Sequence, residues 1–305
     1  MKFGKLSSIE SVDFSLPTIT SDSLQYLEQF KNDTALPKLY IGCTGWGMKE
    51  WIGNTYPKGA KAKDFLKYYG EQFNTIELNT THYRIPDEAT VLKWKDETPS
   101  DFHFSPKVPQ SISHSRDLGL SGNNIQWFCN NIRLLEEKLG CCFMQLPPYF
   151  DINRADLLRQ FLHNFPKDIP LSVEFRHESW FANSTVFQDM MEFFRANNIA
   201  TVITDVSGRR DVLHQEVTSN QLVIRFVGNA LHPTDYSRID RWIEELQKLY
   251  EAGLQEIYFF PHEPDNILAP QMARYVFEGA QQHLKVVTRG PDLEKHREGE
   301  QMSLF

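Results

Sequence analysis

The sequence predicts an α/β fold of the TIM type, a (β/α)8 barrel with an N-terminal helical extension and a flexible C-terminal tail. Eight short apolar segments, rich in Val, Ile, Leu or Phe, alternate with amphipathic stretches along most of the 305 residues. Several segments are apolar on both faces, as parallel strands covered by helices are. The alternative is an open doubly wound sheet, and the lack of a glycine-rich loop after the first segment disfavours it.

The expected strands and helices follow one another in order, so each parallel strand is reached by a right-handed crossover. The predicted strands are residues 39–43, 75–79, 102–106, 141–146, 171–175, 199–204, 222–227 and 256–260. The predicted helices are residues 63–73, 87–98, 122–139, 154–164, 185–197, 235–252 and 270–283.

Three regions are expected along the chain. Residues 1–37 precede the repeating pattern and form an N-terminal extension, in which Ser21 or Asp22 caps a short helix. Residues 38–287 form the barrel. Residues 288–305 are charged, contain Pro and Gly and lack apolar residues until the last few positions, so we expect an exposed tail.

Composition limits the classes of function. Lys and Arg total 32 and Asp and Glu total 40, so the net charge is −8, which argues against bulk binding of polyanions and leaves only a local basic patch. The four cysteines form no disulfide framework, and the adjacent Cys141 and Cys142 are expected in the core. Without a signal peptide or a long apolar segment, we expect a cytoplasmic protein that does not contact membranes.

Polar residues end nearly every predicted strand, where barrels of this type carry their catalytic groups. Glu77 and Asn79 are two residues apart and face one side of their strand, as do Glu174 and Arg176. The expected catalytic residues are Glu77, Glu174, Asp205 and His177. The expected substrate-binding residues are Trp46, Asn79, Tyr83, Arg84, Lys107, Gln145, Arg176, Trp180, Arg225 and His262.

Each residue type suggests a role. Arginine and lysine hold anionic oxygens, and here Arg84, Lys107, Arg176 and Arg225 are available. Glu77 or Glu174 acts as general acid or base with Asp205 in support, and the indole of Trp46 or Trp180 stacks on a ring of the substrate. The alternative is a purely structural role, in which these charged residues form ion pairs that join neighbouring strands.

A divalent metal, Zn, Mn or Mg, is a further alternative. His82, His177 and His262 could act as ligands together with the carboxylates of Glu77, Glu174 and Asp205. None of these residues has the short local spacing of a metal motif, and the nearby cations disfavour a cation site.

Several strings resemble the DUF72 family, whose members are TIM barrels of unassigned function. They are IGCTGWGMKEWIGNTYP, FNTIELNTTHYRIP, FHFSPKVPQSISH, FMQLPP, VEFRHESWF and VITD, in this order. The resemblance covers residues 39–283, implies a barrel and implies no reaction. Its recurrent polar positions correspond to Trp46, Trp51, Glu77, Asn79, Tyr83, Arg84, Lys107, Gln145, Glu174, Arg176, His177, Trp180, Asp205 and Arg225. The eighth strand departs from the family, because His262 stands in a region where relatives tend to carry Asn.

The last five residues resemble the peptide with which bacterial replication and repair proteins bind the sliding clamp. Gln301 can hydrogen-bond the rim of a pocket that Leu304 and Phe305 fill, with Met302 and Ser303 between them. The alternative is a tail that docks on the barrel.

Three hypotheses follow. The leading one is an enzyme that hydrolyses a phosphodiester or glycosidic bond in a phosphorylated or nucleic-acid-derived substrate, recruited to DNA by the clamp. The second is a metal-dependent isomerase or hydrolase of a free small sugar. The third is a non-catalytic ligand-binding adaptor. The sequence does not decide the substrate, the metal or the oligomeric state.

Overall fold

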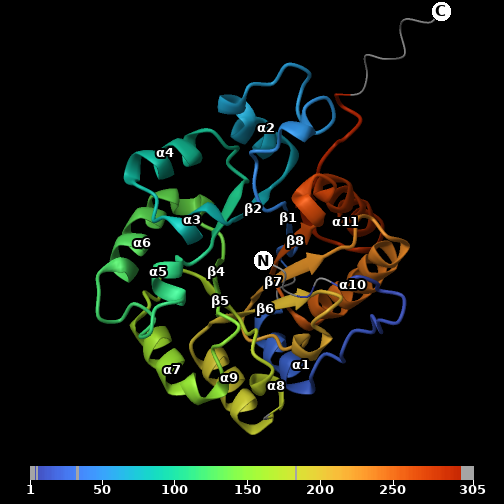
Figure 1. Ribbon diagram of the computed structural model, residues 1–305. Coiled ribbons are helices and arrows are strands. Elements are labelled where there is room, and N and C mark those ends of the chain that lie inside the picture. The colour runs from blue at the N-terminus through green and yellow to red at the C-terminus, as the bar shows by residue number, and fades with distance from the viewer. Residues whose placement is uncertain (1–3, 5, 32–33, 183, 297–305) are drawn as a thin grey trace, which may run out of the picture.

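The computed structural model describes residues 4, 6–31, 34–182 and 184–296, and it has an α/β fold built on parallel strands. In Figure 1 the strands gather at the centre and the helices surround them. The strands are β1 (Lys38–Ile41), β2 (Thr75–Leu78), β3 (His103–Pro106), β4 (Cys142–Gln145), β5 (Leu171–Glu174), β6 (Ala200–Asp205), β7 (Gln221–Val227), β8 (Glu256–His262) and β9 (Val287–Arg289). The eight predicted strands are present close to their expected bounds.

The strands form two sheets rather than the single continuous sheet that we predicted. One has seven strands in the order β4-β5-β6-β7-β8-β1-β9, and the other pairs β2 with β3. Isolated backbone hydrogen bonds join the two sheets: Glu77 N donates to Cys43 O (3.0 Å), and Gly140 N donates to Phe104 O (2.8 Å). A closed barrel therefore does not follow from the assigned sheets.

Strand β9 was not predicted, and it pairs with β1 on the edge where we expected β2. β9 pairs with β1 on the edge opposite β8, with Lys38 level with Val287. Next to it, the side-chain amide of Asn74 takes the place of a neighbouring backbone, because Oδ1 accepts from Ile41 N (2.7 Å) and Nδ2 donates to Leu39 O (3.0 Å). Gly42 permits this close approach, since a Cβ there would lie 1.9 Å from Thr75 O.

Helices follow most strands, as predicted. They are α1 (Ser21–Leu27), α2 (Phe65–Gln72), α3 (Thr80–Tyr83), α4 (Glu88–Asp96), α5 (Gln110–Ser113), α6 (Asn124–Ile132), α7 (Ala155–Asn164), α8 (Ser179–Ala182), α9 (Ser184–Ala196), α10 (Pro233–Ala252) and α11 (Ala269–His283). The short helices α3, α5 and α8 were missed, because a single turn leaves little hydrophobic periodicity. The helix predicted over residues 122–139 ends at Ile132 and continues as a 3-10 segment that Glu136 breaks with φ 51°.

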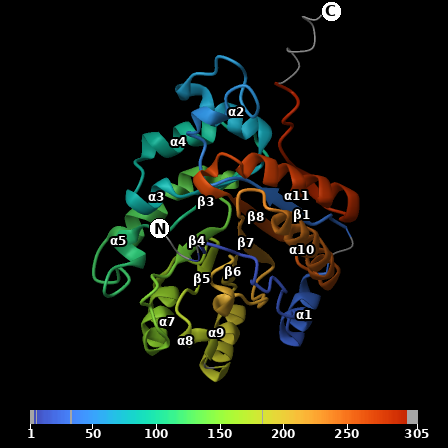
Figure 2. The ribbon, with the colours of Figure 1, turned by 45° about the vertical axis from the view of Figure 1, so that its right-hand side comes forward.

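The connection from β6 to β7 is the exception, because residues 206–220 contain only the 3-10 turn Arg210–Val212. The N-terminal extension occupies the vacant position, and α1 lies between α9 and α10 in the ring (Figures 1 and 2). Ser23 Oγ donates to Glu216 Oε2 (3.1 Å) and accepts from Val217 N (2.9 Å). Thr20, not Ser21 or Asp22, caps α1.

The core has an inner and an outer part. Alternate strand residues form a small inner cluster enclosed by the strands, made of Tyr40, Cys141, Phe143, Ala200, Val202, Val223, Tyr258 and Phe260. The intervening residues pack outward against the helices in two larger clusters. Cys141 belongs to the inner cluster and Cys142 to the outer one, which confirms the prediction that both are core residues.

The predicted exposed tail begins differently from expectation. Thr288 and Arg289 belong to β9, and Arg289 pairs with Asp101 (2.8 Å) and donates to Gly70 O (2.8 Å). Pro291 is buried. The clamp-like peptide, residues 301–305, lies outside the described residues.

Within the described part of the chain, no helix combines the length and the apolar character that crossing a membrane requires.

Candidate functional site

Polar side chains replace the apolar inner cluster at the carboxyl ends of the strands. Val223 belongs to the inner cluster, so Arg225, two residues further along β7, faces the same way. The same alternation brings six inward-facing side chains together, which are nearly fully buried except for His262. These are Glu77, Lys107, Gln145, Glu174, Arg225 and His262.

Arg225 is the centre of this group and bridges both glutamates. Its Nε and Nη2 donate to Oε2 and Oε1 of Glu77 (2.9 and 3.0 Å), and its Nη1 donates to Glu174 Oε2 (2.9 Å). Such a paired guanidinium holds the Glu77 carboxylate in one fixed plane. Arg225 thus joins β7 to both β2 and β5, the kind of contact expected if strand-end charges form ion pairs between strands.

A second chain of contacts runs through the amide of Gln145. Lys107 Nζ donates to Gln145 Oε1 (3.0 Å), and Gln145 Nε2 donates to Glu174 Oε2 (2.7 Å). Arg176 Nε lies 3.1 Å from Glu174 Oε1, as expected for two residues on one side of β5 and its extension. Three cations therefore surround two carboxylates.

His262 and Asn79 complete the surroundings of Glu77. His262 Nε2 lies 2.9 Å from Glu77 Oε2, and Asn79 Nδ2 donates to Glu77 Oε1 (2.8 Å). The His262 side chain is 17% exposed while that of Glu77 is fully buried, so the imidazole is the more accessible member of the pair.

The charges of the group have clear physical causes. Burial opposes ionisation of Glu77, but Arg225 and His262 outweigh it and hold the pKa of this carboxyl well below its usual range. Glu174 is likewise buried, and Arg225 and Arg176 lower its pKa. Burial and then Arg225 lower the pKa of Lys107 to about 8. At neutral pH the site thus has two carboxylates and three cations.

Two hydroxyl groups under this site were missed by sequence reasoning. Ser105 Oγ and Thr204 Oγ1 are buried and have no hydrogen-bond partner among the described residues. Ser105 lies two residues before Lys107, and Thr204 lies two residues after the inner-cluster residue Val202. Strand alternation alone could have identified both as inward-facing.

Residues 40–297 match a family model described as "Protein of unknown function DUF72". The chain belongs to the DUF72 family. UPF0759 protein YecE of Escherichia coli strain K12 is 26% identical over 285 residues, which cover 88% of this chain and 100% of that protein. UPF0759 protein YunF of Bacillus subtilis strain 168 is 28% identical over 234 residues, 72% of this chain and 80% of that protein.

Solved structures of the family share the fold. A DUF72 family protein of Thermotoga maritima MSB8 superposes with a TM-score of 0.64 at 25% identity and covers 80% of this chain and 99% of its own. A DUF72 family protein of Enterococcus faecalis V583 gives a TM-score of 0.66 at 20% identity, over 83% and 98% of the two chains. The family description assigns no function, so a function can be inferred only from the residues of the site.

Asp205, which was expected to support catalysis, lies in a different network. It is fully buried, Arg210 pairs with its Oδ1, and Arg238 Nη2 lies 2.8 Å from the same atom. Trp242 Nε1 donates to Oδ2 (2.9 Å). Since Arg238 and Trp242 belong to α10, Asp205 joins β6 to a helix outside the strands and does not meet Glu77.

The expected stacking residues also lie elsewhere. Trp180 is fully buried beside Phe150 and Phe175, and its Nε1 donates to Phe150 O (2.9 Å), so it is a core residue. Trp51 is fully buried as well. Trp46 is partly buried and packs edge-on against Trp94, with ring centroids 6.0 Å apart.

The remaining predicted residues lie at the edge of the site. His177 Nδ1 lies 2.8 Å from Ser179 Oγ at the start of α8, which indicates a local turn rather than a catalytic contact. Tyr83 and Arg84 are exposed next to α3. For the metal alternative, the described residues contain no group of three or more His, Cys, Asp or Glu side chains able to hold an ion.

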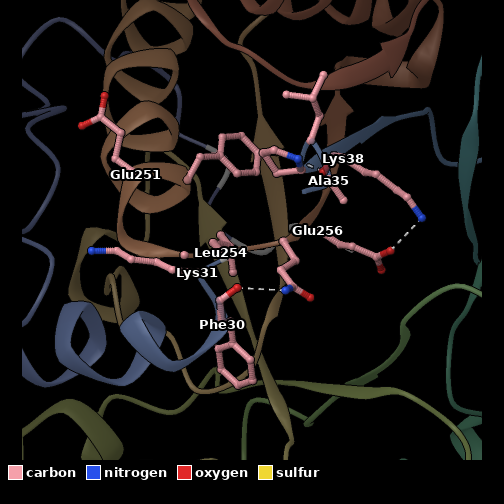
Figure 3. Close-up of a pocket in the computed structure, with 12 residues that line it drawn as sticks. Phe30, Lys31, Ala35, Lys38, Glu251, Leu254 and Glu256 are labelled. Carbon is pink, nitrogen blue, oxygen red and sulfur yellow. Dashed lines mark hydrogen bonds and ion pairs between the residues drawn. The ribbon is translucent and has the colours of Figure 1, made fainter. Parts of the chain in front are cut away.

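A pocket of about 430 Å³ lies at the opposite, amino-terminal end of the strands (Figure 3). Lys38 and Glu256 at its edge form an ion pair of 3.4 Å, and Phe30 O accepts from Gln255 Nε2 (3.0 Å). The pocket contains none of the residues around Arg225. We therefore place the candidate site at the carboxyl ends, where the buried charges converge.

Proposed function

We propose that the protein is an enzyme that hydrolyses a phosphodiester bond at the carboxyl ends of its strands. The observation that carries this proposal is the convergence of Lys107, Arg176 and Arg225 around two ionised carboxylates. The group has one positive charge in excess, and buried cations of this kind bind phosphoryl oxygens strongly. Ser105 and Thr204 offer two further donors.

His262 is the general base in this proposal. Glu77 is ionised, so it can only accept a hydrogen bond, and His262 Nε2 must therefore carry the proton. That tautomer leaves a lone pair on Nδ1, which can remove a proton from an attacking water molecule. The sequence assigned this role to Glu77 or Glu174, but both are tied to arginines, and Glu77 instead orients the imidazole.

Lys107 is the general acid. Its pKa of about 8 keeps it mostly protonated at neutral pH, yet low enough to donate a proton to a leaving oxygen. Water attacks phosphorus, His262 takes a proton from it, the P–O bond breaks, and Lys107 protonates the departing alkoxide.

A glycosidic bond is the less favoured target. Glycoside hydrolysis usually needs one neutral carboxylic acid beside a carboxylate. Here arginine lowers the pKa of both Glu77 and Glu174. The arrangement therefore suits phosphate chemistry better than sugar chemistry.

The proposal includes a closed TIM-type barrel, which would bring β2 and β3 into the ring. It is supported by the hydrogen bonds from Glu77 N to Cys43 O and from Val108 N to Phe143 O (3.0 and 2.9 Å), which span the two junctions between the sheets. It also includes recruitment by a bacterial sliding clamp in the cytoplasm through residues 301–305. Deletion of these five residues should abolish binding to purified clamp in surface plasmon resonance, and unchanged binding would end this part.

The reaction is tested with three chromogenic compounds, p-nitrophenyl phosphate, bis(p-nitrophenyl) phosphate and p-nitrophenyl β-glucoside. We expect release of p-nitrophenolate from the diester, with the rate of His262→Ala reduced by about 10²- to 10⁴-fold. Lys107→Met should lower this rate less, because p-nitrophenolate leaves as a stable anion and does not need a proton from a general acid. His283→Ala, which removes an exposed histidine at the end of α11, is the matched control and should retain the full rate. Release from none of the three, or equal rates in all variants, would contradict the proposal.

A further inference from the structure

Three exposed aromatic rings stand on consecutive connections at one side of the candidate site. Tyr83 is 75%, Trp127 58% and Tyr149 59% exposed, and they follow β2, β3 and β4. Among the described residues, no other Phe, Tyr or Trp side chain is exposed to this degree. We call Tyr83, Trp127 and Tyr149 the aromatic rim.

Contacts between the connections fix the rim as one surface. Tyr149 Oη donates to the backbone oxygen of His114 at the end of α5 (3.3 Å). The ring of His82 lies 5.3 Å from those of both His114 and Tyr83. Figure 1 shows α3, α5 and α6 together on one side of the ring of helices.

Trp127 joins the same surface from α6. Asn131, one turn further along this helix, donates from Nδ2 to Pro86 O (2.6 Å), three residues after Tyr83. Residues four apart lie on one face of a helix, so Trp127 shares the face that looks toward this loop.

Arginines lie on the same three connections as the rings. Arg84 follows Tyr83 and is exposed. Hydrogen bonds from Thr90, and to a lesser extent the positive charge of Arg84, lower the pKa of Asp87. Arg116 is exposed, and its guanidinium has no hydrogen bond or ion pair within the described residues. Arg154 donates to Arg116 O (2.5 Å) and stacks on Phe150 at 4.6 Å. Acids lie on the same connections, at Asp87, Asp117 and Asp151, and each accepts a hydrogen bond from a backbone N–H group.

The rim continues into the candidate site. His82 Nδ1 lies 3.3 Å from the backbone oxygen of Val108, the residue after Lys107. Burial is the main cause that lowers the pKa of His82 and of His114, and the positive charge of Lys107 is the second cause for both. A chain of phosphates along the rim would thus end at the cations around Glu174.

We propose that the aromatic rim binds single-stranded nucleic acid, with bases stacked on its rings and phosphates held by Arg84 and Arg116. Exposed rings alternating with cations are the arrangement that binds single strands without reading their sequence. Arg84, Arg116 and Arg154 supply the cations for this contact in a chain whose net charge is −8. Only cleavage of the bound strand rests on the proposed function, because binding can be measured without any hydrolysis.

The experiment is fluorescence anisotropy with a fluorescein-labelled single-stranded oligothymidylate and the full-length chain. Tyr83→Ala, Trp127→Ala and Tyr149→Ala should each weaken binding by roughly 5- to 150-fold, the value of one lost stack. Leu92→Ala, which removes an exposed apolar side chain from α4, should not change it. Arg116→Gln should lower the slope of log affinity against log salt by about one.

An abasic oligomer with the same number of phosphates separates stacking from charge, and we expect it to bind about tenfold or more weakly. Equal binding of the abasic oligomer, or unchanged affinity in all three ring variants, would overturn the inference. Salt-independent binding of an oligosaccharide in place of the oligonucleotide would also overturn it. Rim binding without release of p-nitrophenolate would sustain the inference and reject the proposed hydrolysis, whereas release without rim binding would do the opposite.

Discussion

Two buried carboxylate–arginine networks lie at the carboxyl ends of the strands, and they differ in the side of the strand on which they lie. Glu77 is held by Arg225 inside the strands, together with the accessible imidazole of His262. Asp205 is held by Arg238 and Trp242 of α10, outside the strands. In both, burial opposes ionisation and the neighbouring arginines lower the pKa of the acid.

The comparison teaches that a buried ion pair at a strand end is not by itself a catalytic site. Asp205 shares every local property of Glu77, namely a strand end, apolar neighbours and an arginine partner. What separates them is where their partners lie. The recorded partners of Asp205 tie β6 to α10 or to the loop after β6, whereas Glu77 contacts Arg225 of β7 and His262 of β8 on the inner side of the strands.

The largest effect is expected when the outer network is broken. Asp205→Asn removes one of the two carboxylates that pair with Arg238, which is 2% exposed and keeps Asp235 at 3.2 Å. We therefore expect a loss of about 3 kcal/mol of unfolding free energy, the lower end of the cost of breaking a buried ion pair. Urea denaturation measures this loss. Asp189→Asn, on the exposed face of α9, is the control and should change stability by less than about 0.5 kcal/mol.

The inner network should respond to pH through Lys107. Its pKa is about 8 in the folded protein against 10.5 for an unperturbed lysine, so between these values the unfolded chain binds more protons and the free energy of unfolding rises with pH. The rise should amount to roughly 2–3 kcal/mol and be absent in Lys107→Met. Urea titrations between pH 7 and pH 10.5 test this, and an equal slope in the variant would contradict it.

A smaller effect is expected at Glu263, which follows β8 and whose Oε2 accepts from Ala230 N (2.8 Å). Burial and then Asp235 raise its pKa to about 7 from 4.5. The folded state therefore binds more protons than the unfolded state in this range, and stability falls as pH rises. Glu263→Gln should be more stable than the original chain at pH 8 by roughly 1–3 kcal/mol, and equal melting curves would count against this.

The sequence predicted where eight of the strands lie along the chain, and it placed Glu77 with Asn79 and Glu174 with Arg176. It could also have separated Asp205, because Val202 is apolar, Thr204 continues its side of the strand and Asp205 takes the opposite side. It could not show which arginine meets which acid, since Arg225 reaches Glu77 across 148 positions of sequence.

Two further features depend on tertiary structure alone. Nothing in residues 206–220 predicts that α1, far away in the sequence, fills the place of the absent helix. Trp180 follows a strand end, as a stacking residue would, but Phe150 and Phe175 enclose it. Proximity in sequence to a strand end does not determine which way a loop residue turns.

The most direct test compares the two networks in one assay, the release of p-nitrophenolate from bis(p-nitrophenyl) phosphate at a temperature where every variant is folded by circular dichroism. We predict that Glu77→Gln lowers the rate by about 10²-fold or more, because the imidazole of His262 loses its orienting carboxylate, while Asp205→Asn stays within about threefold of the original rate. Equal losses in both variants, or a loss in Asp205→Asn alone, would contradict the distinction between an inner catalytic network and an outer structural one.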